Sequence, residues 1–209
     1  MKKLLASLLL VLGITTASFA AAPAAADPEN TLYLDLQYGR VVIQLRPDLA
    51  PKHVARVKEL VRKGFYNGLI FHRVIAGFMA QTGDPTGTGM GGSGQNIPAE
   101  FTAEPFTRGT VGAARAQDIN SADSQFFIMF DENSSLNNQY TVWGKVTSGM
   151  EFVDKIRKGE PPMNPDKIVK MQVAADADKG AAPAKAPAAA PAAAAPAPAA
   201  APAATGDKK

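Results

Sequence analysis

The most informative segment of the chain is Phe71-His72-Arg73-Val74-Ile75-Ala76-Gly77-Phe78-Met79-Ala80-Gln81-Thr82-Gly83-Asp84-Pro85. It begins like a strand that carries one arginine, and a glycine, a Phe-Met pair and a glutamine follow. Alternation along this strand places Arg73 on one face with Phe71 and Ile75, and His72 on the other. A second segment, residues 124–129 (Ser-Gln-Phe-Phe-Ile-Met), fits a buried strand. Taken singly, Arg73 fits an exposed strand position and the bulky apolar residues fit an ordinary core.

The pattern around these segments predicts a mainly β fold. Apolar residues alternate over 32–36 and 41–45, on either side of a Tyr-Gly-Arg turn, and predict a β-hairpin. Pro51 fits the first turn of a helix, and Gly64 fits its left-handed C-terminal cap. Short strands, two helices and long glycine-rich connections favour a closed, mostly antiparallel barrel with helical plugs. Further strands are predicted over 69–75, 125–130, 141–146 and 167–173, and a second helix over 151–157.

The two ends of the chain differ from the part between them. Lys2 and Lys3, an apolar run and small residues are typical of a secretory signal peptide over residues 1–22, with cleavage between 20 and 26. The apolar run is too short for a membrane span, so we expect none in the mature protein. Residues 176–209 are rich in Ala and Pro and lack the side chains that offset ordering entropy, which predicts a disordered tail. We therefore expect one exported, periplasmic domain over residues 27–175.

Composition excludes several functional classes. The 209 residues include no cysteine and two histidines, which excludes disulfides, a thiol nucleophile and a three-histidine zinc site. Loss of Lys2 and Lys3 with the signal lowers the formal charge from +3 to +1, and no basic cluster indicates nucleic-acid binding. Residues 87–92 match GxGxxG, but no strand precedes them and no helix can follow. Residues 131–135 resemble a calcium loop without its glycine and closing glutamate. Neither a metal nor a cofactor is expected.

Together, the two segments resemble the cyclophilin family of peptidyl-prolyl cis-trans isomerases. Supporting motifs are Gly87-Thr88-Gly89, Gly91-Gly92, Phe101, Trp143-Gly144-Lys145-Val146 and Gly149-Met150. The resemblance spans nearly all of residues 31–173, and the shortened glycine-rich middle is similar to that of compact bacterial, exported members. It implies a closed eight-stranded antiparallel β-barrel capped by two α-helices, with the substrate groove on its outer face.

The resemblance also assigns roles to particular residues. It implies that Arg73 is the catalytic arginine and that Gln81 binds the backbone of the substrate. Ser135 stands where eukaryotic members have a tryptophan, so cyclosporin binding is expected to be weak. The proline pocket would be lined by Phe78, Met79, Phe127 and Leu136, and its rim by His72, Ala114, Arg115 and Tyr140.

The chemistry of the implied reaction agrees with this composition. Rotation about an X–Pro bond makes and breaks no covalent bond, so it requires no nucleophile, acid, base or metal. The leading hypothesis is an isomerase that accelerates this rotation in proline-containing polypeptides during folding of exported proteins, and that acts as a monomer. An alternative is a non-catalytic chaperone module of the cell envelope that binds proline peptides, although such a module has no need of Arg73. A third hypothesis gives the main role to the tail, as an attachment to the envelope or to a partner.

Overall fold

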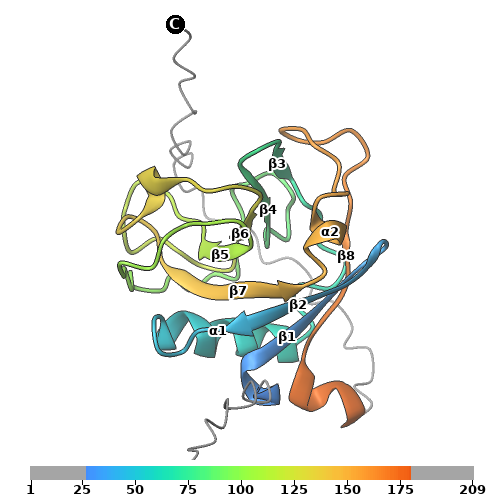
Figure 1. Cartoon of the computed structure of the whole chain (residues 1–209), viewed down its shortest axis with the longest axis horizontal. Helices are drawn as coiled ribbons and strands as arrows, with labels where there is room; N and C mark the ends of the chain where they lie inside the picture. Colours follow the sequence, from blue (N-terminus) through green and yellow to red (C-terminus); the bar gives the residue numbers. More distant parts are fainter. Residues whose placement is uncertain (1–26, 180–209) are drawn as a thin grey trace, which may run out of the picture.

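The computed structural model describes residues 27–179 (Figure 1), so the predicted signal peptide and most of the predicted tail lie outside the described residues. Among residues 27–179, no helix is long and apolar enough to cross a membrane. The strands are β1 (Thr31–Leu36), β2 (Gly39–Leu45), β3 (Arg73–Ile75), β4 (Met79–Thr82), β5 (Thr110–Ala113), β6 (Phe126–Met129), β7 (Val142–Ser148) and β8 (Ile168–Val173). The helices are α1 (Pro51–Arg62), α2 (Met150–Val153) and the 3₁₀ turns η1 (Pro28–Asn30), η2 (Ser134–Leu136) and η3 (Ala174–Lys179). Residues 176–179, which composition assigned to the tail, belong to η3.

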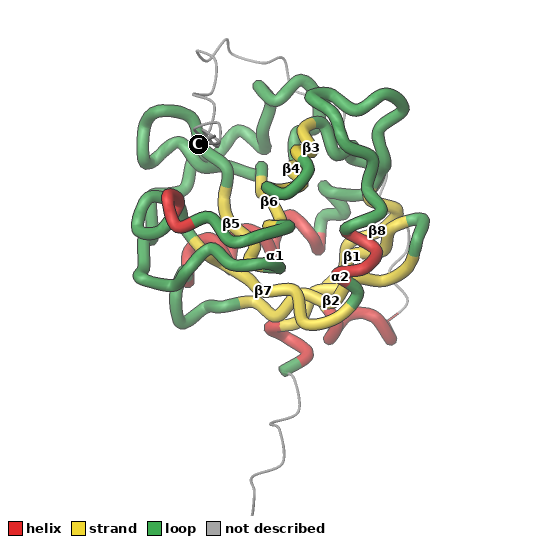
Figure 2. The backbone as a smooth tube through the Cα atoms, turned by 45° about the horizontal axis from the view of Figure 1, so that its top comes forward, coloured by secondary structure: helices red, strands yellow, loops and turns green. Residues whose placement is uncertain are grey.

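The eight strands form one antiparallel sheet in the order β3-β4-β6-β5-β7-β2-β1-β8. The predicted closed barrel is wrong, because this sheet is an open, curled half-barrel whose edge strands β3 and β8 do not pair with each other. Between the two edges, an isolated bridge joins Ile70 and Lys167 outside both strands, and the Gly68 N–H donates to the Ile168 carbonyl at 2.7 Å. No ladder forms here: Phe71 and His72 belong to no strand, and long loops surround this half of the molecule (Figure 2).

The predicted hairpin and first helix are confirmed. β1 and β2 pair with Leu34 opposite Val41, and the alternating apolar residues of both strands are buried in the main core. Pro51 occupies the first turn of α1, whose buried face packs into the same core, and Gly64 has a φ of 69° just after the helix. α1 lies against the sheet (Figure 1). The apolar faces of the hairpin and of the helix therefore predict this half of the fold.

Other elements depart from the pattern. The strand predicted over 69–75 is reduced to Arg73–Ile75, and the helix predicted over 151–157 is reduced to Met150–Val153. β4 and β5 were not predicted, because both strands are short and buried almost throughout, so they show no polar alternation, and unlike β6 they contain no run of large apolar residues. These two short strands lie on either side of β6 and form the part of the sheet that carries the pocket described next.

Candidate active site

One cross-strand row organises a cavity of about 570 Å³ on the sheet. Arg73 on β3 pairs with Gln81 on β4, Gln81 pairs with Phe127 on β6, and Phe127 pairs with Gly112 on β5. Directly paired residues of antiparallel strands point to the same face, so the guanidinium, the amide and the phenyl ring lie side by side. The cavity is lined by His72, Arg73, Phe78, Met79, Gln81, Gly87, Thr88, Gly89, Ala114, Arg115, Phe127, Leu136, Tyr140, Glu160 and Pro161.

The two faces of this part of the sheet bury two different apolar clusters. The next cross-strand row along the strands points to the other face of the sheet and belongs to the main core. It consists of Val74, Ala80, Ile128 and Val111. The opposite face carries a second, smaller cluster, which forms the apolar wall of the cavity. This pocket cluster consists of Met79, Phe106, Phe127, Met129, Leu136 and Val142, with Leu49, Ile75, Phe78, Ala114 and Tyr140 packed against it.

Alternation fails just before β3. Phe71, expected to share a face with Arg73, is fully buried in the main core. His72, expected to face away from Arg73, lines the cavity and is 5% exposed. The expectation was wrong because residues 71 and 72 precede the strand. Burial lowers the pKa of the His72 ring, although Asp84 acts in the opposite direction, so the imidazole is neutral near pH 7.

The polar groups of the cavity are held by hydrogen bonds. The Gln81 Nε2 donates to Gln125 Oε1 at 2.9 Å, and Gln125 Nε2 donates in turn to the carbonyls of Gly89 and Gly91. Gln81 is therefore oriented by a side chain that also holds the glycine-rich loop. At the far end, the Arg115 guanidinium lies 4.6 Å from the centre of the Tyr140 ring.

Asp84 fixes the loop that forms one wall of the cavity. The buried carboxylate accepts hydrogen bonds from the Thr86 N–H at 2.7 Å, the Thr86 hydroxyl at 2.8 Å and the Gly89 N–H at 2.6 Å. Burial is the largest single influence on the Asp84 pKa and raises it, but these hydrogen bonds together outweigh it and hold the pKa below its ordinary value.

Replacing Asp84 by asparagine is expected to lower the free energy of unfolding by about 1–3 kcal/mol at pH 7, because the amide cannot accept all of these hydrogen bonds. The pKa of Asp84 is lower in the folded protein than in the unfolded chain. Its stabilising contribution is therefore complete above the ordinary aspartate pKa, and it is lost as the pH falls through the lower folded value. Urea unfolding of both proteins at pH 7 and in acid measures the difference, which should shrink in acid. A difference that does not change with pH would contradict this role.

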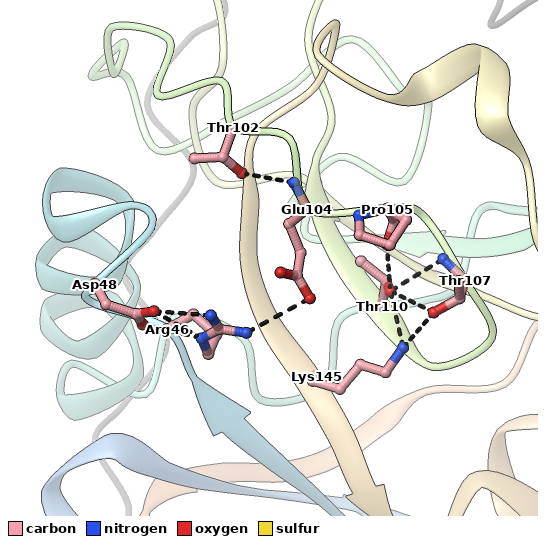
Figure 3. A network of polar contacts seen from close by, with 8 residues as sticks. All are labelled: Arg46, Asp48, Thr102, Glu104, Pro105, Thr107, Thr110 and Lys145. Atoms are coloured by element: carbon pink, nitrogen blue, oxygen red, sulfur yellow. Dashed lines mark hydrogen bonds and ion pairs between the residues drawn. The ribbon is translucent and has the colours of Figure 1, made fainter.

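The floor of the cavity is supported from the outside. Phe106 stacks on Phe127 with ring centres 5.7 Å apart, and its backbone N–H donates to Asn137 Oδ1 at 2.9 Å. The segment around Phe106 is anchored by the network in Figure 3, in which Lys145 Nζ donates to the Thr107 hydroxyl at 2.6 Å. Nearby, Glu104 lies 3.5 Å from the Arg46 guanidinium. The rigidity of Phe127 thus depends on a loop that does not itself line the cavity.

Gly112 lies directly under this pair of rings. A Cβ atom at this position would lie 2.6 Å from ring atoms of both Phe106 and Phe127. Gly112→Ala is therefore expected to displace Phe127 into the cavity, to lower the free energy of unfolding by about 1–3 kcal/mol and to weaken peptide binding. Urea unfolding and peptide titration measure the two effects. Unchanged peptide affinity would show that the ring has not moved.

All ten site residues named from the sequence line the cavity, so the structure brings them together, while their roles stay predictions. Five further residues line it: Gly87, Thr88, Gly89, Glu160 and Pro161. The three loop residues belong to the run that matched a dinucleotide motif, but no sequence signal pointed to Glu160. Within residues 27–179, no three acidic or histidine side chains cluster in a way that could hold a metal ion.

A curled antiparallel sheet with an apolar cavity beside an arginine defines a protein suited to binding a peptide segment. Residues 31–173 match the family described as "Cyclophilin type peptidyl-prolyl cis-trans isomerase/CLD". The chain therefore belongs to the cyclophilin-type peptidyl-prolyl cis-trans isomerases.

Individual relatives agree with this membership. A Brucella suis protein named "Probable peptidyl-prolyl cis-trans isomerase" is 59% identical over 169 residues, covering 73% of this chain and 86% of its own length. "Peptidyl-prolyl cis-trans isomerase B" of Bacillus subtilis is 43% identical over 134 residues, covering 63% and 93%. Among solved structures, the Hirschia baltica cyclophilin AquaCyp293 has a TM-score of 0.67 at 30% identity and covers 76% of this chain and 77% of its own.

Proposed function

We propose that this protein accelerates cis-trans rotation of X–Pro bonds in exported polypeptides, with Arg73 as the catalytic residue. The observation that carries the proposal is the row in which Arg73, Gln81 and Phe127 lie side by side above the pocket cluster. A solved Cryptosporidium parvum cyclophilin-type isomerase was crystallised in the presence of the dipeptide Ala-Pro; it has a TM-score of 0.64 at 29% identity and covers 68% of this chain and 98% of its own. That structure supports a proline-containing peptide as the ligand of the corresponding cavity.

Each part of the cavity has a separate task in this mechanism. The apolar side chains of Met79, Phe127 and Leu136 hold the pyrrolidine ring and exclude water from it. Gln81 holds the substrate backbone on one side of the proline while the other side rotates. The Arg73 side chain is 22% exposed, so it can reach a peptide and still lie against a low-dielectric wall.

Arginine is suited to the rotation because of how the amide changes. In the planar ground state the proline nitrogen shares its lone pair with the carbonyl, and resonance sets a barrier of about 18–20 kcal/mol. In the twisted transition state the lone pair is localised and accepts a hydrogen bond from an Arg73 Nη–H group. This interaction is stronger in the transition state than in the ground state, and it therefore lowers the barrier. One charge-assisted hydrogen bond supplies roughly 1.5–3 kcal/mol, and the closed apolar surroundings supply the rest.

The cellular part of the proposal is folding of exported proteins in the periplasm. It is supported by the charged, apolar and small-residue segments of residues 1–22 and by the absence of cysteine, which leaves no thiol to be oxidised outside the cytoplasm. Fractionation of cells that express the full chain, beside a chain lacking residues 2–22, tests this location. Recovery of both chains in the cytoplasm would refute it.

The activity itself is tested with a protease-coupled assay of a proline-containing tetrapeptide and the full chain. The first-order rate constant of isomerisation should rise in proportion to protein concentration. Binding of the peptide with no increase over the uncatalysed rate would instead support a non-catalytic peptide-binding module.

A further inference from the structure

Glu160 brings a negative charge to the cavity wall beside Arg73. Its Oε2 accepts a hydrogen bond from Arg73 Nε at 2.7 Å, and both side chains line the cavity. Glu160 is 51% exposed, so its carboxylate faces solvent and an incoming peptide as well as the arginine. Nothing in the sequence segments that define the site predicts this residue.

The backbone around Glu160 is anchored to the same strand that carries Arg73. Gly159 and Val74 exchange two backbone hydrogen bonds, each of 2.8 Å. Gly159 has a φ of 148°, and a Cβ there would lie 2.5 Å from Pro162 Cα, so a glycine is needed at this position. Downstream, the buried Asp166 side chain accepts a hydrogen bond from the Arg157 N–H at 2.8 Å. The loop is therefore held on both sides of Glu160, and its carboxylate meets Arg73.

The geometry of this ion pair differs from that of three other arginines on the surface. Arg40, Arg46 and Arg108 each donate two or more hydrogen bonds to one carboxylate and use an Nη group to do so. Arg73 uses its Nε, and within residues 27–179 its Nη groups make no hydrogen bond. A half-exposed ion pair adds little to stability. The ion pair with Glu160 instead fixes the Arg73 side chain and leaves its Nη groups free to donate.

The charge of Glu160 also gives the cavity a polarity. Arg73 is on β3 and Ala114 follows β5, and these strands are separated by three strand spacings, or roughly 14 Å. Glu160 lies at the β3 end, and Arg115 lies at the β5 end. A peptide that crosses the strands therefore meets a negative group at one end and a positive group at the other.

We propose that Glu160 is a positioning residue for Arg73 and a specificity determinant that favours a cationic side chain on one flank of the substrate proline. This inference rests on the proposed isomerase function and adds a substrate preference to it. The carboxylate attracts a lysine or arginine that lies over the β3 end of the cavity, and it repels an acidic residue there. At the same time it limits rotation of the guanidinium, so that the Nη groups stay at the proline nitrogen.

Two variants separate these two roles. Glu160→Gln retains an oxygen that accepts from Arg73 Nε but removes the charge, whereas Glu160→Ala removes both. The substrates are Ala-Pro peptides with Lys, Gln or Glu on either flank, and exchange NMR with the full chain measures their isomerisation without a coupling protease. We expect the wild type to favour Lys over Glu on one flank by about two- to fivefold in kcat/KM at low salt, and less at high salt. Glu160→Ala should abolish this preference and lower kcat by roughly three- to tenfold, and Glu160→Gln should abolish the preference with a smaller loss of kcat than Glu160→Ala.

The matched control is Asp154→Asn, which removes the charge of one acidic side chain of similar exposure from an ion pair with Arg108 outside the cavity. It should leave both the preference and kcat unchanged. An active wild type with no charge preference, or a preference that persists in Glu160→Gln, would overturn the specificity role. Wild-type kcat in Glu160→Ala would overturn the positioning role. If the wild type isomerises none of the peptides, the proposed function fails and this inference fails with it.

Discussion

Replacing Arg73 by alanine is expected to lower kcat/KM for a proline-containing peptide by about 10- to 100-fold, with the peptide Kd changed by less than about threefold. The guanidinium hydrogen bond to the proline nitrogen forms fully only in the twisted transition state, whereas the apolar pocket and Gln81 bind the peptide in both states. Removing Arg73 therefore removes transition-state stabilisation and leaves most of the ground-state binding. Isomerisation kinetics and peptide titration of the same preparation measure the two quantities.

Two further variants sharpen this prediction. Arg73→Lys keeps the charge but lacks the planar fork, so its activity should be intermediate. Arg108→Ala removes an arginine whose ion pair with Asp154 lies outside the cavity, and it should isomerise the peptide at the wild-type rate. Equal losses of affinity and turnover in Arg73→Ala would mean that the arginine acts only as a binding group.

Phe127→Ala is expected to lower the free energy of unfolding by about 3–5 kcal/mol and to raise KM by at least about tenfold. The ring is 5% exposed, stacks on Phe106 and meets Tyr140 edge-on with ring centres 5.9 Å apart. Its loss opens the apolar wall that would hold the pyrrolidine ring, so the peptide loses contacts in both the ground and transition states. Urea unfolding and steady-state kinetics below the unfolding transition measure the two effects.

The neighbouring residue of the same strand is the matched control. Phe126 is buried on the opposite face, in the main core, with edge-on contacts to Tyr66 and Trp143. Phe126→Ala should therefore destabilise the protein to a similar degree without raising KM. The milder Phe127→Leu and Phe126→Leu pair provides the same comparison if either alanine variant fails to fold. A similar rise in KM for both positions would contradict a specific role of Phe127 in the pocket.

The sequence patterns predicted the elements that bury one clear face. The β1–β2 hairpin and α1 follow from apolar periods of about two and about 3.6 residues, and these periods persist along their whole length. The open sheet could not be predicted in this way, because closure depends on whether the two distant edges pair. Phe71 shows the limit most clearly: it continues the apolar pattern of β3, yet it lies outside the strand and packs into the main core.

The site was predictable to the extent that the resemblance to the family assigned residues to it: six lie in the two segments, and Ala114, Arg115, Leu136 and Tyr140 lie outside them. Arg73, Gln81 and Phe127 come from three different strands, and the register that aligns them is a property of the whole sheet. Glu160 was missed because it reaches Arg73 through the bridge between Gly159 and Val74, which joins residues 85 positions apart in the chain. No local pattern of charge or apolar residues carries information about such a contact.

The most direct measurement of the central claim is the cis-trans exchange rate of a proline peptide while it is bound, determined by exchange NMR for the wild type and for Arg73→Ala at matched bound fractions. If the guanidinium stabilises the twisted amide, the wild type should interconvert the two bound isomers at least about tenfold faster than the variant. Equal exchange rates in the two proteins at the same bound fraction would contradict this role of Arg73.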